Sequence, residues 1–556
     1  MQHNSRKDLR ISLLLLLAGA VMFLPFLGRV HLFDWDEINF AECAREMLVA
    51  KQYFLVTINY LPFWEKPPLF IWFQALSMKT FGVSDYAARL PDALCGITAL
   101  ITLYHIGKIW KDRRFGLLWV LAYTGSILPY FYFKSGIIDP WFNFFIFTGV
   151  YFFTRFRMQK MNLLPGKANR LIAFSAICIG LAVLTKGPVA FLIFILSVIV
   201  YWLKKKRNAI FSFGQVSLYA LVFIAVGGAW FITAALTGHL NTLVEFVQYQ
   251  IRLLNTQDAG HGGPFYFHVP VLLFGCFPAS IFAIRGMLIR KNGDAKLNEA
   301  RIVMAILFWV VLIMFSIVKT KIIHYSSLCY YPITFFAALA AYKMFYENYP
   351  WKKWMSWGLA LTGGLVGIAL AGLPIAAMHK QAIIASGIIK DPFAEANLQA
   401  NVHWSYWDCS MGIFLLLAIV CCIVLASKKK PEQSVIAIFI ATLITTNTTL
   451  VFSAPKIEQY TQQAAVGFYQ GLAGKDVYVA TLGFKSYAQY FYSDVQPWKN
   501  KKSTDIDWLL RGNIDKPAYF VSKINKVEGY EKQYPQLKEL YRKNGFVFLK
   551  RVNKGK

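Results

Sequence analysis

The chain is poor in charge, and poorest in acidic residues. Only 16% of its 556 residues are charged, with 29 Asp and Glu against 58 Lys and Arg. A soluble protein of this length would carry far more charge. Because 57% of the residues are hydrophobic and the mean hydropathy is +0.44, the composition indicates a polytopic membrane protein.

Cysteine is also scarce, and glycine forms no phosphate-binding pattern. None of the eight cysteines has the spacing of a zinc or redox motif, which argues against a structural metal and a disulfide framework. No Rossmann-like glycine run is present, so a soluble nucleotide-sugar fold is not expected. Internal repeats and low-complexity segments are absent as well.

The excess of positive charge does not indicate nucleic-acid binding. The net charge of +29 comes mostly from short clusters between apolar runs, such as Lys204–Arg207 and Lys428–Lys430. No basic face is continuous, so nucleic acid is not expected as a partner. Clusters of this kind instead mark the cytoplasmic ends of membrane spans.

Apolar windows of about twenty residues predict about thirteen transmembrane helices. With the N-terminus in the cytoplasm, six basic clusters fall on the cytoplasmic side, and the odd count puts the C-terminal end outside. The chain is therefore expected in the inner (cytoplasmic) membrane, in contact with its lipids. The expected spans are 10–28, 88–109, 115–133, 140–156, 170–185, 187–203, 211–235, 269–289, 302–318, 325–346, 354–377, 410–427 and 434–453.

Two domains follow from this pattern. Residues 1–453 form the membrane domain, whose outer loops 29–87 and 236–268 are long enough to be functional. The first loop holds two amphipathic stretches, 37–50 and 68–81. Residues 454–556 are mixed polar and predict a small extracytoplasmic α/β domain, with three strand-like runs and a helix through Tyr530–Tyr541.

Carboxylates beside the membrane border are the first candidates for chemistry. Asp34 and Glu37 match an acidic capping box that opens a helix. Asp36 is left without a structural role and is the candidate catalytic carboxylate. Asp139, followed by Pro140, fits a helix N-cap equally well as a catalytic role.

Four lysines occupy tight turns on the outer face, where the positive-inside rule does not favour them. Any one of them could extend toward lipid headgroups. Four such turns in one protein instead favour convergence on an anion, and a phosphate-bearing lipid is the natural candidate. These lysines are Lys134, Lys186, Lys319 and Lys321.

Glu65 and Lys66 precede Pro67-Pro68, which fixes the backbone before the next helix. A surface ion pair is the plain interpretation of these two residues. His261 falls on the same side of the membrane as Glu65. Together Glu65 and His261 could bind a divalent metal such as zinc, although two distant ligands are common by chance.

Motifs in several loops resemble those of bacterial aminoarabinose lipid A transferases, which belong with the protein O-mannosyltransferase-like enzymes of the GT-C fold. The resemblance covers about residues 10–335. Two departures concern the aminoarabinose members: they usually carry arginine where this chain has Asn39, and Lys-Gly-Lys where it has Lys319-Thr320-Lys321. The matching motifs are Asp36-Glu37-x-x-x-Ala41-Glu42, Glu65-Lys66-Pro67-Pro68, Ile138-Asp139-Pro140, Thr185-Lys186-Gly187, His261-x-x-Pro264-Phe265 and Phe315–Lys321.

The resemblance implies transfer of a sugar from a polyprenyl-phosphate donor, such as one built on undecaprenyl phosphate, outside the membrane. It makes Asp36 the key carboxylate and Glu65 and His261 the metal ligands. Tyr325 matches a cavity tyrosine. The residues that it implies for the phosphate cavity are Lys66, Asp139, Lys186 and Lys319.

The reaction expected is a single displacement with inversion, onto lipid A, another cell-envelope glycan or a protein. Asp36 would act as base for a hydroxyl acceptor and would orient a phosphate acceptor. The rival from another class is a lipid-linked sugar flippase, which would place its charges at mid-membrane. A scaffold that only anchors the C-terminal domain would give the lysine turns no purpose.

Overall fold

The computed structural model describes residues 2–205, 210–256, 262–289 and 293–552. Helices make up most of this part of the chain, and a four-stranded sheet lies near the C-terminus. The helices up to the start of that sheet are α1 (Gln2–Phe23), α2 (Asp36–Ala50), α3 (Leu69–Phe81), α4 (Asp85–Trp110), α5 (Arg113–Thr124), α6 (Ile127–Phe131), η1 (Tyr132–Lys134), α7 (Asp139–Lys160), α8 (Ala168–Lys186), α9 (Val189–Lys204), α10 (Phe213–Phe223), η2 (Ile224–Gly228), α11 (Ala229–Leu236), α12 (Leu240–Asn255), α13 (His268–Gly275), α14 (Ala279–Met287), α15 (Ala295–Ile317), η4 (Ile323–Cys329), α16 (Tyr330–Tyr346), α17 (Lys353–Met378), α18 (Lys380–Ala385), α19 (Pro392–Leu398), η5 (Tyr406–Cys409), α20 (Ser410–Ser427), α21 (Pro431–Thr448), η6 (Thr449–Ser453), α22 (Ala454–Tyr460) and α23 (Gln463–Gln470).

The long apolar helices make this a polytopic membrane protein. Among the described residues, eight helices are long and apolar enough to cross a membrane, or up to ten if each of two bent pairs is one span. The expected number of thirteen therefore stays a prediction. α1, α7 and α9 coincide with expected spans but are not among these eight.

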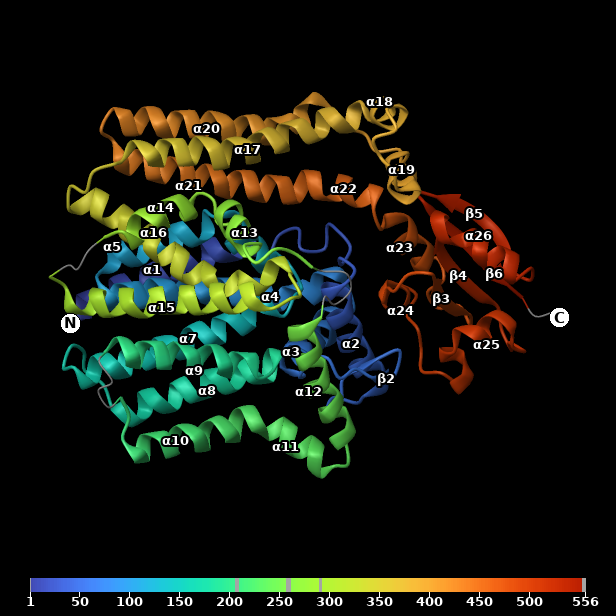
Figure 1. Cartoon of the computed structure of the whole chain (residues 1–556), viewed down its shortest axis with the longest axis horizontal. Coiled ribbons are helices and arrows are strands. Elements are labelled where there is room, and N and C mark those ends of the chain that lie inside the picture. The colour runs from blue at the N-terminus through green and yellow to red at the C-terminus, as the bar shows by residue number, and fades with distance from the viewer. Residues whose placement is uncertain (1, 206–209, 257–261, 290–292, 553–556) are drawn as a thin grey trace.

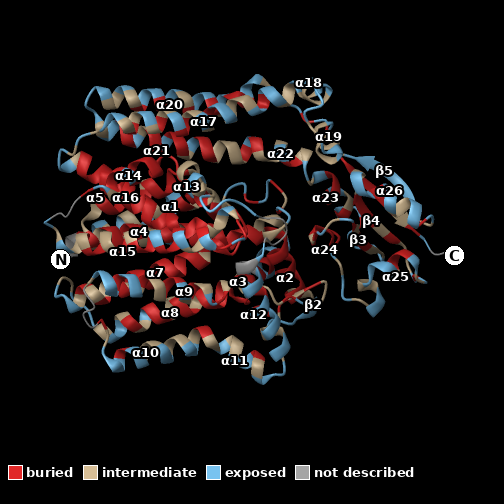
Figure 2. Ribbon diagram, in the orientation of Figure 1, coloured by how far each residue is buried: buried red, intermediate tan, exposed pale blue. Residues whose placement is uncertain are grey.

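The spans lie side by side as a bundle, and Figure 1 shows the N-terminus at one end of it and the C-terminal domain at the other. The central helices, among them α4 and α16, are mostly buried, whereas α10, α17 and α20 on the outside expose much of their surface (Figure 2). Exposed apolar side chains on these outer helices, such as Leu221, Leu361 and Leu417, fit contact with lipid.

Small residues bring neighbouring spans close together. A Cβ added at Gly107 of α4 would lie 2.6 Å from the Cα of Gly116 in α5, and one at Gly116 would lie 2.4 Å from the carbonyl oxygen of Tyr104. Such backbone contact is typical of membrane helices, which gain packing where no side chain intervenes.

The C-terminal domain is built on a mixed sheet of order β3-β4-β6-β5, with β3 and β4 parallel and the other pairs antiparallel. This confirms the small α/β domain expected from sequence. Its elements are β3 (Tyr478–Leu482), α24 (Ala488–Tyr492), η7 (Lys501–Thr504), α25 (Ile506–Arg511), β4 (Ala518–Lys523), α26 (Ile524–Gln533), β5 (Lys538–Lys543) and β6 (Phe546–Arg551).

The helix predicted through Tyr530–Tyr541 is wrong in its second half. α26 ends at Gln533, and Lys538–Lys543 is the edge strand β5. A turn at Asn544 and Gly545, both with positive φ, returns the chain into β6, so pairing with β6 overrides local helix preference. All six residues of β5 are exposed, and its charged side chains suit a free sheet edge.

The first outer loop lies between the bundle and the C-terminal domain. It contains α2 and α3, which confirm the two amphipathic stretches expected from sequence, and a short hairpin of β1 (Thr57–Ile58) and β2 (Leu61–Pro62). One hydrophobic core joins Ile38 and Met47 of α2 to Val466 and Phe548 of the C-terminal domain. This core therefore holds α2 against the C-terminal domain.

Candidate active site

A small cavity opens where several helices end beside the first outer loop. Its volume is about 40 Å³, so it holds one or two water molecules and must widen to admit a sugar phosphate. Six segments far apart in sequence form its wall. The lining residues are Trp35, Asp36, Asn39, Phe40, Phe63, Glu65, Lys66, Ile138, Lys186, Tyr249, Ile322, His324 and Tyr325.

Asp36 is the first residue of α2 and lines this cavity. The predicted capping box is wrong: Trp35 occupies the N-cap position, and no side chain caps the helix. The carboxylate of Asp34 turns toward Ser486 and Tyr487 of the C-terminal domain. Asp36 is thus the acid of this cluster that faces the cavity.

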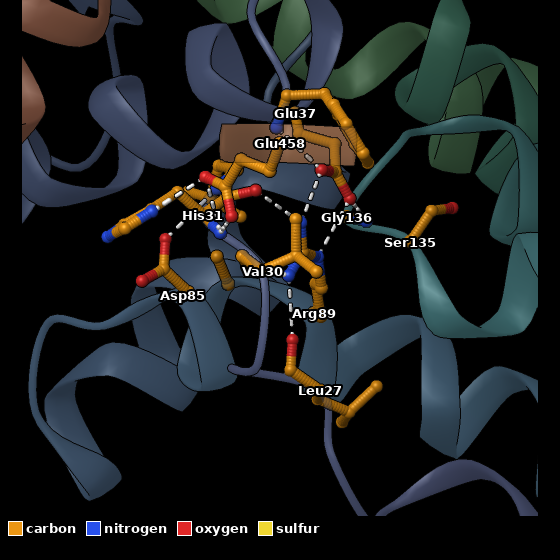
Figure 3. Close-up of polar contacts among 12 residues, drawn as sticks. Leu27, Val30, His31, Glu37, Asp85, Arg89, Ser135, Gly136 and Glu458 are labelled. Atoms are coloured by element: carbon orange, nitrogen blue, oxygen red, sulfur yellow. Dashed lines mark hydrogen bonds and ion pairs between the residues drawn. The ribbon is translucent and has the colours of Figure 1, made fainter. Parts of the chain in front are cut away.

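Glu37 has a structural role of a different kind. Its carboxylate accepts hydrogen bonds from the Arg89 guanidinium at 2.7 and 2.9 Å and from the backbone N–H of Gly136 at 2.6 Å. Arg89 also donates to the carbonyl oxygens of Leu27 and Val30, at 2.7 and 2.6 Å (Figure 3). Burial favours the neutral acid, but Arg89 outweighs burial and leaves the pKa of Glu37 below its ordinary value.

This Glu37–Arg89 clamp ties α2, α4 and the turn before α7 together. Because Asp36 precedes Glu37 and Asp139 follows Gly136 closely, the clamp fixes the backbone at both acids. A buried ion pair with all its hydrogen bonds made holds such geometry firmly.

Asp139 and Lys186 form the second polar feature of the site. Lys186 Nζ lies 2.6 Å from Asp139 Oδ1, and the two side chains are 14% and 4% exposed. Asp139 begins α7, but Ile138 is the N-cap residue and no cap bond forms. The capping alternative is therefore not what the structure shows. The Lys186 ammonium also lies 5.3 Å from the ring centre of Tyr325.

His324 is a cavity residue that the sequence did not indicate. Its Nε2 lies 3.4 Å from Asp36 Oδ2 and 3.8 Å from Asp139 Oδ2. It therefore stands between the two candidate catalytic acids. The only signal in sequence was a lone histidine three residues after Lys321, which is too common a pattern to single out.

Lys66 and Glu65 approach from the loop before α3. Burial lowers the pKa of Lys66, and the neighbouring Lys186 ammonium adds to this effect against the opposing influence of Glu65. Two ammonium groups close enough to influence each other make a site that favours an anion. The Lys66 ammonium lies 5.1 Å from the ring centre of Tyr249 in α12.

Three predicted phosphate ligands lie elsewhere, so their role stays a prediction. Lys134 donates to the carbonyl oxygens of Met22 and Pro25 at 3.2 and 2.7 Å. Lys321 donates to three carbonyl oxygens around the end of α15. Lys319 is exposed and does not line the cavity.

The metal site expected from Glu65 and His261 cannot be placed. Glu65 lines the cavity, whereas His261 lies outside the described residues. Among the residues that the structure does describe, no three His, Cys, Asp or Glu side chains gather as metal ligands.

Comparison with known proteins finds relatives that are named as sugar transferases. The family model described as dolichyl-phosphate-mannose-protein mannosyltransferase matches residues 65–230. An undecaprenyl phosphate-alpha-4-amino-4-deoxy-L-arabinose arabinosyl transferase of Pectobacterium atrosepticum is 25% identical over 438 residues, covering 75% of this chain and 76% of that protein. The equivalent protein of an Enterobacter species is 26% identical over 338 residues, 60% of this chain and 59% of its own length.

Solved structures show the fold. The crystal structure of ArnT from Cupriavidus metallidurans bound to undecaprenyl phosphate superposes with a TM-score of 0.74 over 98% of both chains, at 17% identity. The Archaeoglobus fulgidus oligosaccharyltransferase in its apo form gives 0.52 over 93% of this chain and 70% of its own, at 12% identity. The chain is a membrane glycosyltransferase of the GT-C fold.

Within this GT-C glycosyltransferase, one departure from the aminoarabinose transferases falls in the cavity wall. Asn39 stands where those enzymes usually carry arginine, and it lines the cavity beside Asp36. Its Oδ1 is buried and has no hydrogen-bond partner among the described residues. The wall therefore presents a neutral amide to the substrate at this position.

Proposed function

We propose that this enzyme transfers a sugar from a polyprenyl-phosphate donor, such as one built on undecaprenyl phosphate, to a cell-envelope acceptor on the extracytoplasmic side of the membrane. One observation carries the proposal: Asp36, Lys66 and Lys186, from three distant segments, line one cavity at the ends of membrane helices. A phosphate carried on a lipid in the bilayer suits a cavity at the ends of membrane helices.

The residues divide into two roles. Lys66 and Lys186 supply fixed positive charge to the phosphate that leaves with the bonding electron pair. Asp36 takes the proton from an acceptor hydroxyl as its oxygen bonds to the anomeric carbon, and it orients an acceptor that is already an anion. A single attack of this kind inverts the anomeric centre, because the acceptor oxygen displaces the phosphate directly and no covalent sugar–enzyme intermediate forms.

The identity of the transferred sugar is not part of this proposal. The Pectobacterium and Enterobacter proteins are named for aminoarabinose, but Asn39 replaces the arginine usual in such enzymes. The acceptor is lipid A or another envelope glycan in the first instance. A protein acceptor is the second candidate, because the family model that matches residues 65–230 describes protein mannosyltransferases.

Orientation and metal belong to the same proposal. The basic clusters put the N-terminus in the cytoplasm, and in Figure 1 the C-terminal domain lies at the opposite end of the bundle, hence outside. A divalent metal held by Glu65 and His261 is tested by elemental analysis of the purified protein, with Glu65→Gln as the comparison. No step of the transfer is assigned to it.

The decisive experiment removes the Asp36 charge. Asp36→Asn leaves expression and folding intact and abolishes transfer, scored by mass spectrometry of lipid A and of glycoproteins from cells that carry only the variant. Asp34→Asn is the matched control, because Asp34 faces the C-terminal domain, and it keeps most of the activity. Turnover near normal in Asp36→Asn would remove Asp36 from the mechanism.

A further inference from the structure

A second and larger cavity lies in the C-terminal domain, away from the cavity that holds Asp36. Its volume is about 510 Å³, within the range of small-molecule sites. Strand β3 forms one wall, and the segment 493–504 forms another. Asn59, from the β1–β2 hairpin of the first outer loop, completes it.

The walls combine aromatic rings with three lysines and two acids, Asp476 and Asp494, the second of which pairs with Arg45. Tyr478 and Trp498 are half-buried, so each keeps part of its ring surface accessible. Lys475 and Lys499 are exposed at the same cavity, and Lys516 pairs with Asp476 at 2.7 Å. An aromatic ring such as that of Trp498 stacks on the apolar face of a sugar ring, whereas the Lys516 ammonium lies 4.4 Å from the ring centre of Tyr478. Lysines bind phosphate or carboxylate as point charges.

The backbone of β3 adds hydrogen-bonding groups. β3 is an edge strand that pairs only with β4, and Tyr478 donates its N–H to Pro517 on that side. In a parallel pair the groups alternate, so the next residue, Val479, directs its N–H and C=O to the opposite side, where the cavity lies. Such groups suit the hydroxyls of a saccharide.

The cavity is close to the catalytic one along the chain. Asn59 lines the larger cavity and Phe63 the smaller, and four residues of extended chain span at most about 14 Å. Trp498 holds this hairpin, since its Nε1 donates to the carbonyl oxygen of Asn59 at 3.0 Å. A molecule of two or three sugar rings is long enough to reach from one to the other.

We propose that this cavity binds an anionic saccharide, a phosphate- or carboxylate-bearing part of the glycan acceptor, and holds it beside the catalytic cavity. The proposal rests on the proposed function for the identity of the acceptor. It names a subsite in a domain that otherwise has no assigned role.

A peptide strand added to β3 is the competing occupant. The segment 493–504, which includes Trp498 and η7, forms the other wall of the cavity that β3 lines. A compact ring fits a cavity of about 510 Å³ with two walls, whereas a continuous strand along β3 would extend beyond it. The unpaired edge of β3 therefore suits hydrogen bonds to a saccharide.

The test measures binding directly on the full-length protein in detergent micelles. Isothermal titration with glucosamine 1-phosphate, N-acetylglucosamine and inorganic phosphate gives the highest affinity for the phosphosugar. The double variant Lys475→Ala/Lys499→Ala weakens its affinity about tenfold, the effect of losing about 1.4 kcal/mol of charge interaction. Lys501→Ala/Lys502→Ala is the matched control, since these lysines are exposed in the same segment but do not line the cavity.

The outcomes separate the alternatives. Equal binding of inorganic phosphate and phosphosugar, or no loss in the double variant, overturns the proposal, and so does binding of an extended peptide in place of any saccharide. Failure of the proposed function appears elsewhere, as undecaprenyl phosphate binding that Lys186→Ala leaves unchanged. Since phosphosugar binding is read without any transfer reaction, either result stands without the other.

Discussion

The ammonium of Lys186 lies 2.6 Å from the carboxylate of Asp139, so the cation of the catalytic cavity already has a counter-ion. An incoming phosphate must share this ammonium with Asp139. The strength of donor binding is therefore set by both side chains, with opposite signs.

Asp139→Asn is expected to bind undecaprenyl phosphate about fivefold more tightly while transfer falls, because Lys186 loses its competitor and the site loses an oriented acid. Lys186→Ala is expected to weaken the same binding. Isothermal titration with undecaprenyl phosphate measures both, and a thermal melt checks folding because breaking a buried pair is costly. Weaker binding in Asp139→Asn would contradict competition for Lys186.

His324→Ala is expected to lower kcat by about ten- to a hundredfold, the range typical of a lost acid–base or hydrogen-bonding group. His324→Gln keeps a donor near Asp36 and is expected to recover part of the rate. Initial rates with saturating donor give the comparison. His403→Ala, exposed in the loop before η5, serves as control, and a normal rate in His324→Ala would exclude a catalytic role.

Arg89→Met is expected to destabilise the protein by about 3–5 kcal/mol, because it leaves the Glu37 carboxylate buried without its partner. Thermal or denaturant unfolding measures the loss. Arg542→Met breaks an exposed pair with Glu539 and is expected to cost less than about 1 kcal/mol. Similar losses of stability in the two variants would show that the Glu37–Arg89 clamp contributes no more than an exposed ion pair.

Glu42 gives a prediction about pH. Burial raises the pKa of this carboxyl to about 8, even though Arg45 lies 2.7 Å away and opposes the shift. A raised folded-state pKa stabilises the folded form at low pH, and this contribution declines from the unfolded value near 4.5 up to about 8.

Glu42→Gln is therefore expected to flatten part of the fall in Tm between about pH 5 and pH 8, since glutamine cannot lose a proton. Differential scanning fluorimetry across this range compares the variant with the wild type. An unchanged slope would show that Glu42 has the same pKa in the folded and unfolded chain.

Lys321→Met is expected to lower Tm while leaving undecaprenyl phosphate binding unchanged. The ammonium caps the end of α15 through the carbonyl oxygens of Ser316 and Val318, both at 2.6 Å. A clear loss of undecaprenyl phosphate binding in a well-folded Lys321→Met would instead support the predicted role of this lysine as a phosphate ligand.

Sequence reasoning identified the residues that their local sequence context could not explain. Asp36 stood out because no structural role explained it, and Lys186 because positive charge is unusual in an outer turn. Both line the cavity. The residues of a turn indicate on which side of the membrane the turn lies. They also indicate that its loop approaches the other loops on that side.

The same reasoning could not tell which turn lysines face the cavity. Lys134 and Lys321 satisfy nearby carbonyl oxygens, and that choice depends on distances of a few ångströms between helix ends. The sequence did not indicate His324, because its role depends on its proximity to two acids that are far away in sequence. The strand β5 was missed because its pairing with β6, and not its own composition, determines its form.

α2 runs from the catalytic cavity to residues that line the larger cavity. Asp36 begins this helix, and Arg45 near its other end donates to Asp494 at 2.9 Å and to the carbonyl oxygen of Val495 at 2.8 Å. Nine residues of helix between them amount to a rigid rod of about 14 Å. Asp494 and Val495 also line the larger cavity, so one rigid helix connects the wall of that cavity to the reactive acid.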